Sequence, residues 1–469
     1  MTRQDAIDRA ADFFDHGHFL RDLAGLVAFP TESQNPDRHS ELSRYLTDIL
    51  LPRLTLIGCE SVVHRNPVPG EGPILVASRI EDPALETVLI YGHGDVTHGQ
   101  EAHWLPGLSP FSVSEVGDKI YGRGTADNKG QHLVNLMALL AVFEIREAAG
   151  QGFGFNLKIV LEMGEETGSP GLAEFFRMHA LDLKADVLIA SDGPRLQAET
   201  PTIFMGSRGG LSFDLRLDLR EGAHHSGNWG GLLADPAIIL AHALATITDA
   251  RGQIQIPEWR PTSLTNAVRE ALAGLPIAEP LGPAIDADWG EESLTPTERA
   301  YGWNSFSVLA MTSGVPEAPV NAISGSARAT CQLRFVVGTD VHDILPALRR
   351  HLDRHGFEAV EIVATEETSF SATRLPPDHP WVRFVAQSLT ETTGKTPHIL
   401  PNLAGSLPNE VFSDILGLPT VWVPHSYRGC SQHAPNEHNL KSICREGLMM
   451  MAGLFWDIGE RSGAERPTQ

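Results

Sequence analysis

The stretch "QHLVNLMALLAVFEIREAAGQGFGFNLKIVLEM", residues 131–163, joins two hydrophobic patterns of different period. Its first part repeats apolar residues at helical spacing and stops at Gly150, as a helix C-terminus often does. Its last part, "LKIVLEM" (157–163), is an apolar run typical of a strand that is buried on both faces. A similar run, "TVLIY" (87–91), precedes the helical part. Strand, helix and strand in this order predict an open α/β sheet.

Two further apolar runs, "DVLIAS" (186–191) and "PTVWVP" (419–424), extend the predicted sheet. Between them the period changes, because "LSFDLRLDL" (211–219) alternates apolar and polar residues as an antiparallel strand with one wet face does. Another strand pattern lies around "ATCQLRFVV" (329–337), with helical segments nearby, so we predict an inserted α+β domain. The predicted organisation is a catalytic α/β domain at 1–207 and 371–460, an inserted domain at 208–370 and a flexible tail at 461–469.

The composition excludes several classes of function. The chain has 469 residues, 42% of them hydrophobic and 20% charged, and contains no apolar run long enough to span a bilayer. Its 59 acidic residues against 36 Lys and Arg give a formal charge of −23, which opposes binding to nucleic acid or anionic membranes. The four cysteines lack CxxC spacing, so neither a disulfide framework nor a thiolate zinc site is indicated. The N-terminal stretch is charged and helix-periodic, unlike a secretory signal, and we expect a cytoplasmic protein.

Polar residues follow the predicted strands, where ligands of open α/β sheets bind. After "TVLIY" comes "GHGDV", with His93 and Asp95 two residues apart and therefore on one side of an extended segment. His93 fits a metal ligand whose other ring nitrogen is held by Asp95, although such an isolated pair is more often a surface hydrogen bond. His98 and His103 are expected to be loop residues. Asp127 in "GRGTADNKGQ" stands at the entrance of the long helix, where an Asp is most often a cap.

Two adjacent glutamates, Glu165 and Glu166, follow the second strand in "EMGEETG" (162–168). Like charges in contact repel, and a buried carboxylate without a partner is costly or becomes neutral. A divalent cation bound by Glu166 would offset this repulsion and leave Glu165 free to act as general base. The alternative is a pair of solvated loop acids.

Two further strand ends carry candidate ligands. "DVLIAS" leads into Asp192 in "SDGP", and "CSQHAPNEHN", which follows "PTVWVP", offers His433 and His438. His433, in the tighter sequence context, is the preferred ligand. Acidic residues and histidines at successive strand ends supply the oxygen and nitrogen donors of a two-metal centre, with zinc favoured and cobalt or manganese as alternatives.

These motifs give the chain a strong resemblance to a di-zinc metallopeptidase family. The family includes carnosinase-type dipeptidases, glutamate carboxypeptidase, aminoacylase and succinyl-diaminopimelate desuccinylase, and the chain looks closest to the carnosinase-like branch. The matching motifs occur in order over nearly the whole chain: "GHGDV", "GRGTADNKG", "GEETGS", "SDG", "HHSGNWGG" and "SQHAPNE". The resemblance implies an open, mostly parallel α/β hydrolase domain with an inserted, ferredoxin-like α+β domain that serves in dimerisation and as a lid.

The resemblance also implies a role for each candidate residue. Asp95 would orient its histidine, and Glu165 would be the general base that also carries the proton to the leaving amine. The family usually has a cis peptide after the bridging aspartate, here between Asp127 and Asn128. The implied metal ligands are His93 and Asp192 for one zinc ion, Glu166 and His433 for the other, and Asp127 as the bridge.

The inserted domain and a later loop supply further implied residues. In "GAHHSGNWGG" the family motif matches His225, not His224. In relatives this histidine reaches the active site of the neighbouring subunit and binds the oxyanion, so a homodimer is implied. Members of the dipeptidase branch more often have a larger residue in place of Gly94 and an acid in place of Asn128. The residues that match substrate-binding positions are Asn321, Arg334, Gly405 and Ser406.

The predicted reaction is hydrolysis of the amide bond of dipeptides, or of small peptide-like substrates with a free carboxylate. A water that bridges two Zn²⁺ ions in each subunit would attack after Glu165 deprotonates it. The alternative is an N-acyl- or N-carbamoyl-amino-acid amidohydrolase, which uses the same chemistry. A remote alternative is an inactive relative that binds metal or peptide, which the intact ligand set and Glu165 disfavour.

Overall fold

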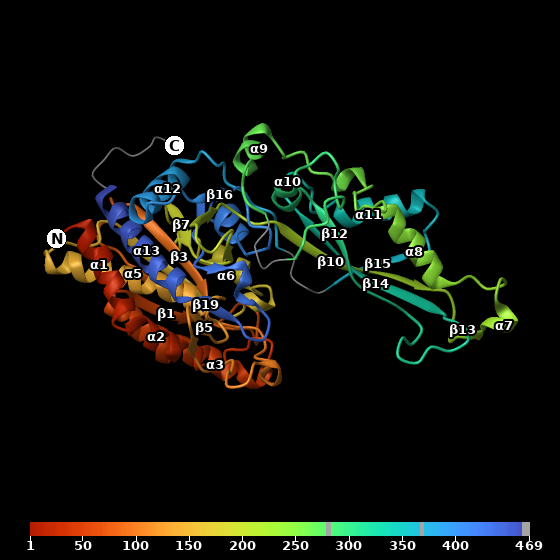
Figure 1. The fold of residues 1–469 in the computed structure, drawn as a ribbon, viewed down its shortest axis with the longest axis horizontal. Helices are drawn as coiled ribbons and strands as arrows, with labels where there is room; N and C mark the ends of the chain where they lie inside the picture. Colours follow the sequence, from red (N-terminus) through yellow and green to blue (C-terminus); the bar gives the residue numbers. More distant parts are fainter. Residues whose placement is uncertain (278–282, 366–369, 462–469) are drawn as a thin grey trace.

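The computed structural model describes residues 1–277, 283–365 and 370–461, which form two lobes, each with its own main sheet (Figure 1). The larger lobe contains the first and the last helix of the described chain, and the middle of the sequence forms the smaller lobe. The predicted tail at 461–469 lies outside the described residues except for Arg461, which ends helix α13.

The large sheet contains the four predicted buried strands. Within the described residues it has eight strands, in spatial order β1 (Glu60–His64), β2 (Ile74–Arg79), β6 (Asn156–Glu162), β3 (Thr87–His93), β7 (Val187–Ala190), β17 (Thr420–Trp422), β9 (Thr202–Phe204) and β16 (His398–Leu400). The four predicted strands β6, β3, β7 and β17 are neighbours, and each adjacent pair is parallel. Parallel strands place their carboxyl ends at one edge of the sheet, so the residues that follow them are brought together there.

Helices cover both faces of the large sheet, because alternate residues of its strands point to opposite sides. Val88 and Ile90 of β3 pack into the cluster formed with α1, α5, α12 and α13, whereas Leu89 and Tyr91 pack into the cluster that includes α6. The helices of this lobe are α1 (Arg3–Asp15), α2 (His18–Val27), α3 (His39–Arg44), α4 (Leu51–Leu56), α5 (Lys129–Ala148), α6 (Leu172–Met178), α12 (Pro380–Thr393) and α13 (Lys441–Arg461). The predicted long helix is α5, and it begins two residues before the predicted helical stretch.

The smaller lobe has a four-stranded antiparallel sheet with strand order β12 (Ser305–Ser313), β14 (Ser326–Phe335), β10 (Gly209–Asp218) and β15 (Glu361–Ala364). Burial alternates along β14, as the predicted pattern of one wet face requires. The helices α8 (Pro236–Ile247) and α11 (Ile344–Arg354) cover the buried face around Trp259. The other helices described between 208 and 370 are α7 (Ser226–Trp229), α9 (Asn266–Leu272) and α10 (Pro296–Tyr301). The buried hydrophobic residues of α9 and α10 pack into the core cluster of the larger lobe that includes α6.

The chain crosses between the lobes twice, and the two crossing segments are hydrogen-bonded to each other. The Thr373 amide donates to the Ser207 carbonyl, and the Leu375 amide donates to the Met205 carbonyl, each at 3.0 Å. The chain therefore leaves and re-enters the larger lobe at neighbouring points, close to the predicted domain boundaries, which stay predictions. The short strands are β4 (Ser114–Val116), β5 (Lys119–Tyr121), β8 (Pro194–Arg195), β11 (His224–His225), β13 (Ala322–Ile323), β18 (Ser426–Tyr427) and β19 (His438–Leu440).

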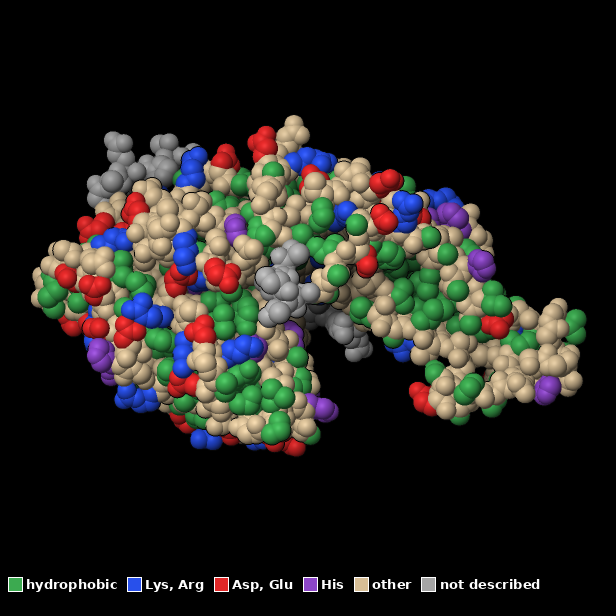
Figure 2. All heavy atoms as spheres, in the orientation of Figure 1, with side chains coloured by type: hydrophobic (Ala, Val, Ile, Leu, Met, Phe, Trp, Pro, Cys, Tyr) green, Lys and Arg blue, Asp and Glu red, His purple; other side chains and the backbone are tan. Residues whose placement is uncertain are grey.

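An α/β lobe with a mostly parallel central run of strands and an antiparallel α+β lobe confirm the predicted fold class. Figure 2 shows that the surface is hollowed between the two lobes on the face that it presents. Helices with the length and hydropathy of a membrane span do not occur among the described residues.

Candidate metal centre

Candidate residues lie at or just after the ends of three parallel strands, and one more lies in a later loop. His93 ends β3, Glu165 and Glu166 form a 3₁₀ turn after β6, and Asp192 lies two residues after β7. His433 lies in the loop that follows β18, with a left-handed backbone conformation of φ 60°. The topology therefore gathers these side chains at one edge of the sheet, as the sequence predicts.

The first potential metal-binding group consists of His93, Asp127 and Asp192. His93 Nε2 lies 3.0 Å from Asp127 Oδ1 and 3.5 Å from Asp192 Oδ2. All three side chains are buried. Asp192 Oδ2 is without a hydrogen-bond partner among the described residues. A buried carboxylate oxygen in this position costs free energy unless a cation or donor reaches it.

The second group consists of Asp127, Glu166 and His433, and it shares Asp127 with the first. His433 Nε2 lies 2.8 Å from Asp127 Oδ2 and 3.1 Å from Glu166 Oε2. Gln432 Nε2 also donates to Asp127 Oδ2, at 2.5 Å. The two oxygens of Asp127 thus face different groups, which is the arrangement that a carboxylate bridging two ions needs.

Asp95 contacts both sides of this centre. Its carboxylate lies 3.4 Å from His93 Nδ1, and its main-chain oxygen lies 3.1 Å from the same nitrogen. The Asp95 carboxylate also accepts hydrogen bonds from the amides of Glu165 and Glu166, at 3.2 and 3.1 Å. The sequence predicts the contact with His93 but not the second pair of contacts. One side chain therefore fixes both the histidine and the turn that carries the two glutamates.

Burial and neighbouring charges shift the pKa values in the centre. Burial raises the pKa of Glu165 well above its usual value, with His93 opposing the shift and neighbouring carboxylates adding to it. Burial also raises the pKa of Glu166 to about 7. Burial by itself lowers the pKa of His433, but contacts with Asp127 and Glu166 outweigh it and raise the value to about 11. The acidic groups therefore need positive charge, which a pair of divalent cations would supply.

The loop that carries Asp127 is shaped by a residue that the sequence reasoning missed. Glu437 Oε1 accepts hydrogen bonds from the amides of Gly124, Ala126 and Asp127 at 3.0 to 3.1 Å, and Arg123 pairs with its other oxygen at 2.8 Å. Glu437 lies in "SQHAPNE", four residues after His433, which is the signal that would have identified it. The peptide bond between Asp127 and its successor is cis, as the resemblance implies.

The two departures from the family pattern have local explanations. A Cβ added to Gly94 would lie 2.4 Å from the ring of Tyr45, so this tyrosine fills the space that a larger residue would take. Asn128 donates to the Ser191 carbonyl at 2.7 Å, and its oxygen lies 3.3 Å from His132 Nδ1. A neutral amide at position 128 can serve as both donor and acceptor in this buried position, which a carboxylate cannot do when ionised.

The remaining histidines of these segments lie outside the two groups. His438 Nε2 lies 2.6 Å from the Tyr427 hydroxyl, so this imidazole has a structural partner. His98 is half exposed, with its Nδ1 3.8 Å from Glu32, and His103 belongs to a short 3₁₀ turn. These positions agree with the preference for His433 and with the prediction that His98 and His103 are loop residues.

The predicted substrate residues divide into two sets. Arg334, Gly405 and Ser406 line a cavity of about 390 Å³ together with Asp127 and Glu165. Arg334 donates to the Ser406 hydroxyl at 3.1 Å, and burial lowers the pKa of this arginine from its usual value. The cavity therefore combines the candidate metal centre with a guanidinium group that suits a carboxylate.

His225 and Asn321 lie elsewhere in this chain. They are neighbours, because the amide of Ser226 donates to the Asn321 carbonyl at 2.9 Å. His225 Nδ1 accepts a hydrogen bond from the Gly227 amide at 3.0 Å and caps α7, which lies at the end of the smaller lobe farthest from the large sheet (Figure 1). Neither residue lines the cavity at the metal centre.

The sequence pattern of one known family matches the chain over residues 89–457. This range covers well over half of the chain and includes every candidate metal ligand. The chain belongs to peptidase family M20/M25/M40. Membership confirms the predicted family, which is a family of peptidases.

Beta-Ala-His dipeptidase of Mus musculus is 35% identical over 195 residues, which are 41% of this chain and 38% of that protein. The chain thus matches less than half of this relative's length. The Cysteinylglycine-S-conjugate dipeptidase of Corynebacterium striatum is 25% identical over 405 residues, 83% of this chain and 84% of that protein. The crystal structure of the M20 family metallo-carboxypeptidase Sso-CP2 from Sulfolobus solfataricus has a TM-score of 0.79 at 24% identity, covering 94% of this chain and 99% of that one. The two dipeptidases confirm the resemblance to the carnosinase-type branch of the family.

Proposed function

We propose that the protein is a two-metal dipeptidase that hydrolyses the amide bond of small peptides with a free carboxylate. The observation that carries this proposal is the pair of ligand groups that share Asp127 beside a cavity lined by Arg334. Family membership and the dipeptidase relatives support it further.

The residues of the centre fit two divalent cations. His93 and Asp192 would hold one ion, Glu166 and His433 the other, and Asp127 would contact both. Nitrogen and carboxylate oxygen donors of this kind suit zinc, with cobalt or manganese as alternatives. When bound, the ions would polarise the scissile carbonyl and make a shared water more acidic at neutral pH.

Glu165 is the proposed general base. Its carboxylate lines the cavity, and Oε2 lies 3.9 Å from His93 Nε2. Glu165 takes a proton from the attacking water as the water oxygen bonds to the carbonyl carbon. It returns this proton to the amine nitrogen as the carbon–nitrogen bond breaks. Arg334 and Ser406 would meanwhile hold the terminal carboxylate of the substrate.

Metal removal and a substrate panel test this function. The chelated, metal-free protein should lose essentially all hydrolysis of its dipeptide substrate, and Zn²⁺ should restore it. The panel should compare dipeptides with N-acetyl- and N-carbamoyl-amino acids on the zinc-loaded protein. Hydrolysis that survives chelation would refute the metal requirement, and turnover of the acylated amino acids alone would favour the amidohydrolase alternative.

We infer that the active unit is a homodimer. β12 is an edge strand, and its apolar side chains Val308, Leu309 and Met311 are 44%, 57% and 43% exposed. An exposed apolar edge strand favours pairing with another chain. His225 caps α7 at the far end of the same lobe, with Asn321 beside it. We infer that pairing through this lobe brings both residues to the partner's cavity.

Mixing two inactive variants tests the action of His225 across the dimer. His225→Ala should lower kcat by about 10²–10³-fold if its imidazole stabilises the oxyanion, whereas the neighbouring His224→Ala should have little effect. When His225→Ala and Glu165→Ala chains are unfolded together and refolded, about a quarter of the sites should regain activity, since half the dimers are mixed and each has one complete site. No recovery in a refolded dimeric mixture would refute the role across the dimer.

A further inference from the structure

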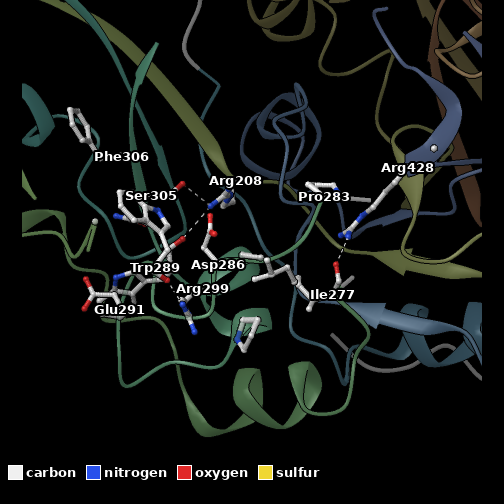
Figure 3. Close-up of a pocket in the computed structure, with 18 residues that line it drawn as sticks. Arg208, Ile277, Pro283, Asp286, Trp289, Glu291, Arg299, Ser305, Phe306 and Arg428 are labelled. Atoms are coloured by element: carbon white, nitrogen blue, oxygen red, sulfur yellow. Dashed lines mark hydrogen bonds between the residues drawn. The ribbon is translucent and has the colours of Figure 1, made fainter. Parts of the chain in front are cut away.

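A second cavity, drawn in Figure 3, has no part in the proposed chemistry. Its volume is about 620 Å³, compared with about 390 Å³ for the cavity at the metal centre. The side chain of Arg428 lines both cavities, so they meet there. We call the larger one, lined by Arg208, Ile285, Trp289, Trp303, Phe306 and Arg428 among others, the outer cavity.

Several aromatic and aliphatic side chains that line the outer cavity are exposed to solvent. Trp289 is 59% exposed and Ile285 is 46% exposed, and both line it. Trp303 and Phe306 add two further aromatic rings, and the indole nitrogen of Trp303 is buried without a hydrogen-bond partner in the described parts of the chain. Large apolar side chains that are exposed together in a hollow mark a ligand site more often than scattered ones do.

Contacts within the chain involve both the main chain around Trp289 and its indole ring. Arg299 contacts the main-chain oxygen of Trp289 and donates to those of Ala287 and Leu294 at 3.3 and 3.1 Å. The indole lies over Gly252, where an added Cβ would be 2.7 Å from the ring. These contacts restrict the segment, which reduces the conformational entropy lost when a ring binds against Trp289.

Two arginines form the wall between the outer cavity and the metal-site cavity. Arg428 donates to the Ile277 carbonyl at 3.0 Å and contacts the Tyr301 hydroxyl. Arg208 donates to the Ala404 carbonyl at 2.8 Å. Tyr301 and Ala404 belong to the lining of the metal-site cavity. A group that extends from a substrate at the metal centre would therefore pass guanidinium planes, which stack favourably on aromatic rings.

We propose that the outer cavity binds a large aromatic side chain of the dipeptide while its backbone stays at the metal centre. The proposal rests on the dipeptidase function above and adds the class of substrate. The wall carries both signs of charge, with Asp286 as well as the arginines, so a charged side chain would meet a like charge whichever sign it had. A neutral ring gains apolar contacts with Trp289 and cation–π contacts with the arginines at once.

Matched dipeptides measure this preference. On the zinc-loaded enzyme, kcat/KM for Phe-Ala or Ala-Phe should exceed that for Ala-Ala by about tenfold or more, the discrimination that an aromatic group gains in an apolar pocket. The order that is preferred identifies the position of the aromatic residue. Trp289→Ala should lower the aromatic-to-alanine ratio to near one, and Ile285→Ala should lower it in part. Ile80→Ala removes a 52% exposed isoleucine on the larger lobe and should leave the ratio unchanged.

The outcomes separate this inference from the proposed function. If Ala-Ala is hydrolysed but neither aromatic dipeptide is preferred, the outer cavity does not bind the ring and the dipeptidase function stands. A preference that survives both Trp289→Ala and Ile285→Ala would also overturn the assignment. If no dipeptide at all is hydrolysed by the zinc-loaded enzyme, the proposed function fails first and the inference fails with it. Should Trp289→Ala reduce the yield of folded protein, Ile285→Ala still gives the test.

Discussion

Glu165→Gln should retain both metal ions and lose turnover by about 10²–10⁴-fold, the range that a positioned general base contributes. The change removes the carboxylate that lines the cavity but keeps the size of the side chain. It also leaves the two ligand groups intact, because Glu165 belongs to neither. Metal content by mass spectrometry and kcat on a hydrolysed dipeptide report the two effects separately.

The adjacent Glu166→Gln gives the sharpest comparison. Its carboxylate belongs to the second ligand group, 3.1 Å from His433, so the first effect should be weaker metal binding. Activity of this variant should recover in part when the metal concentration is raised. Glu174→Gln, an exposed position on α6, is the control and should behave like the wild type. A Glu165→Gln protein that contains two ions and works at the normal rate would show that another group is the base.

Asp127→Ala should abolish activity and reduce the bound metal to well below one ion per chain, compared with the two that we propose for the wild type. Asp127 is the side chain that both groups share, with one oxygen 3.0 Å from His93 and the other 2.8 Å from His433. Metal that binds only the native state stabilises it by about 2.7 kcal/mol at a hundredfold excess over Kd. Zinc should therefore raise the melting temperature of the wild type and should not raise that of this variant.

Two further variants serve as comparisons for Asp127→Ala: Asp192→Ala changes a ligand of one group only, and Asp182→Ala is the control. Asp192 belongs to the first group alone, so its removal should cost one ion and leave the other site measurable. The Asp182 side chain is 80% exposed and its removal should change neither metal content nor melting temperature. If Asp127→Ala still bound two zinc ions at wild-type affinity, the shared-ligand arrangement would be wrong.

The strands that position the candidate metal ligands were predictable because each has a recognisable hydrophobic pattern in the sequence. "TVLIY", "LKIVLEM", "DVLIAS" and "PTVWVP" are short apolar runs, and burial on both faces is what such a composition requires. Each is followed within a few residues by a histidine or an acid, so the convergence of His93, Glu166 and Asp192 follows from parallel pairing. The roles of these residues at the metals stay predictions.

Contacts between distant segments could not be read from local patterns. The hydrogen bonds that Glu437 accepts from the loop at 124–127 join residues more than 300 positions apart. The motif "SQHAPNE" marks Glu437 as a candidate residue, but it does not indicate which segment Glu437 contacts. The Asp95 contacts with the turn after β6 are similar, because they depend on how two strand ends meet. The outer cavity was also missed, since the segment from 250 to 304 has no sustained hydrophobic period and its aromatic residues are scattered.

The dependence of the Asp127 loop on Glu437 has a consequence for biosynthesis. Asp127 is synthesised early. Glu437 and the proposed ligand His433 are synthesised only in the final tenth of translation. Ligands that are not yet arranged bind an ion weakly, because a preformed site rarely exists before folding. We therefore expect a nascent chain to remain free of cations until its C-terminal segment has docked, so that loading with metal is among the last events of maturation.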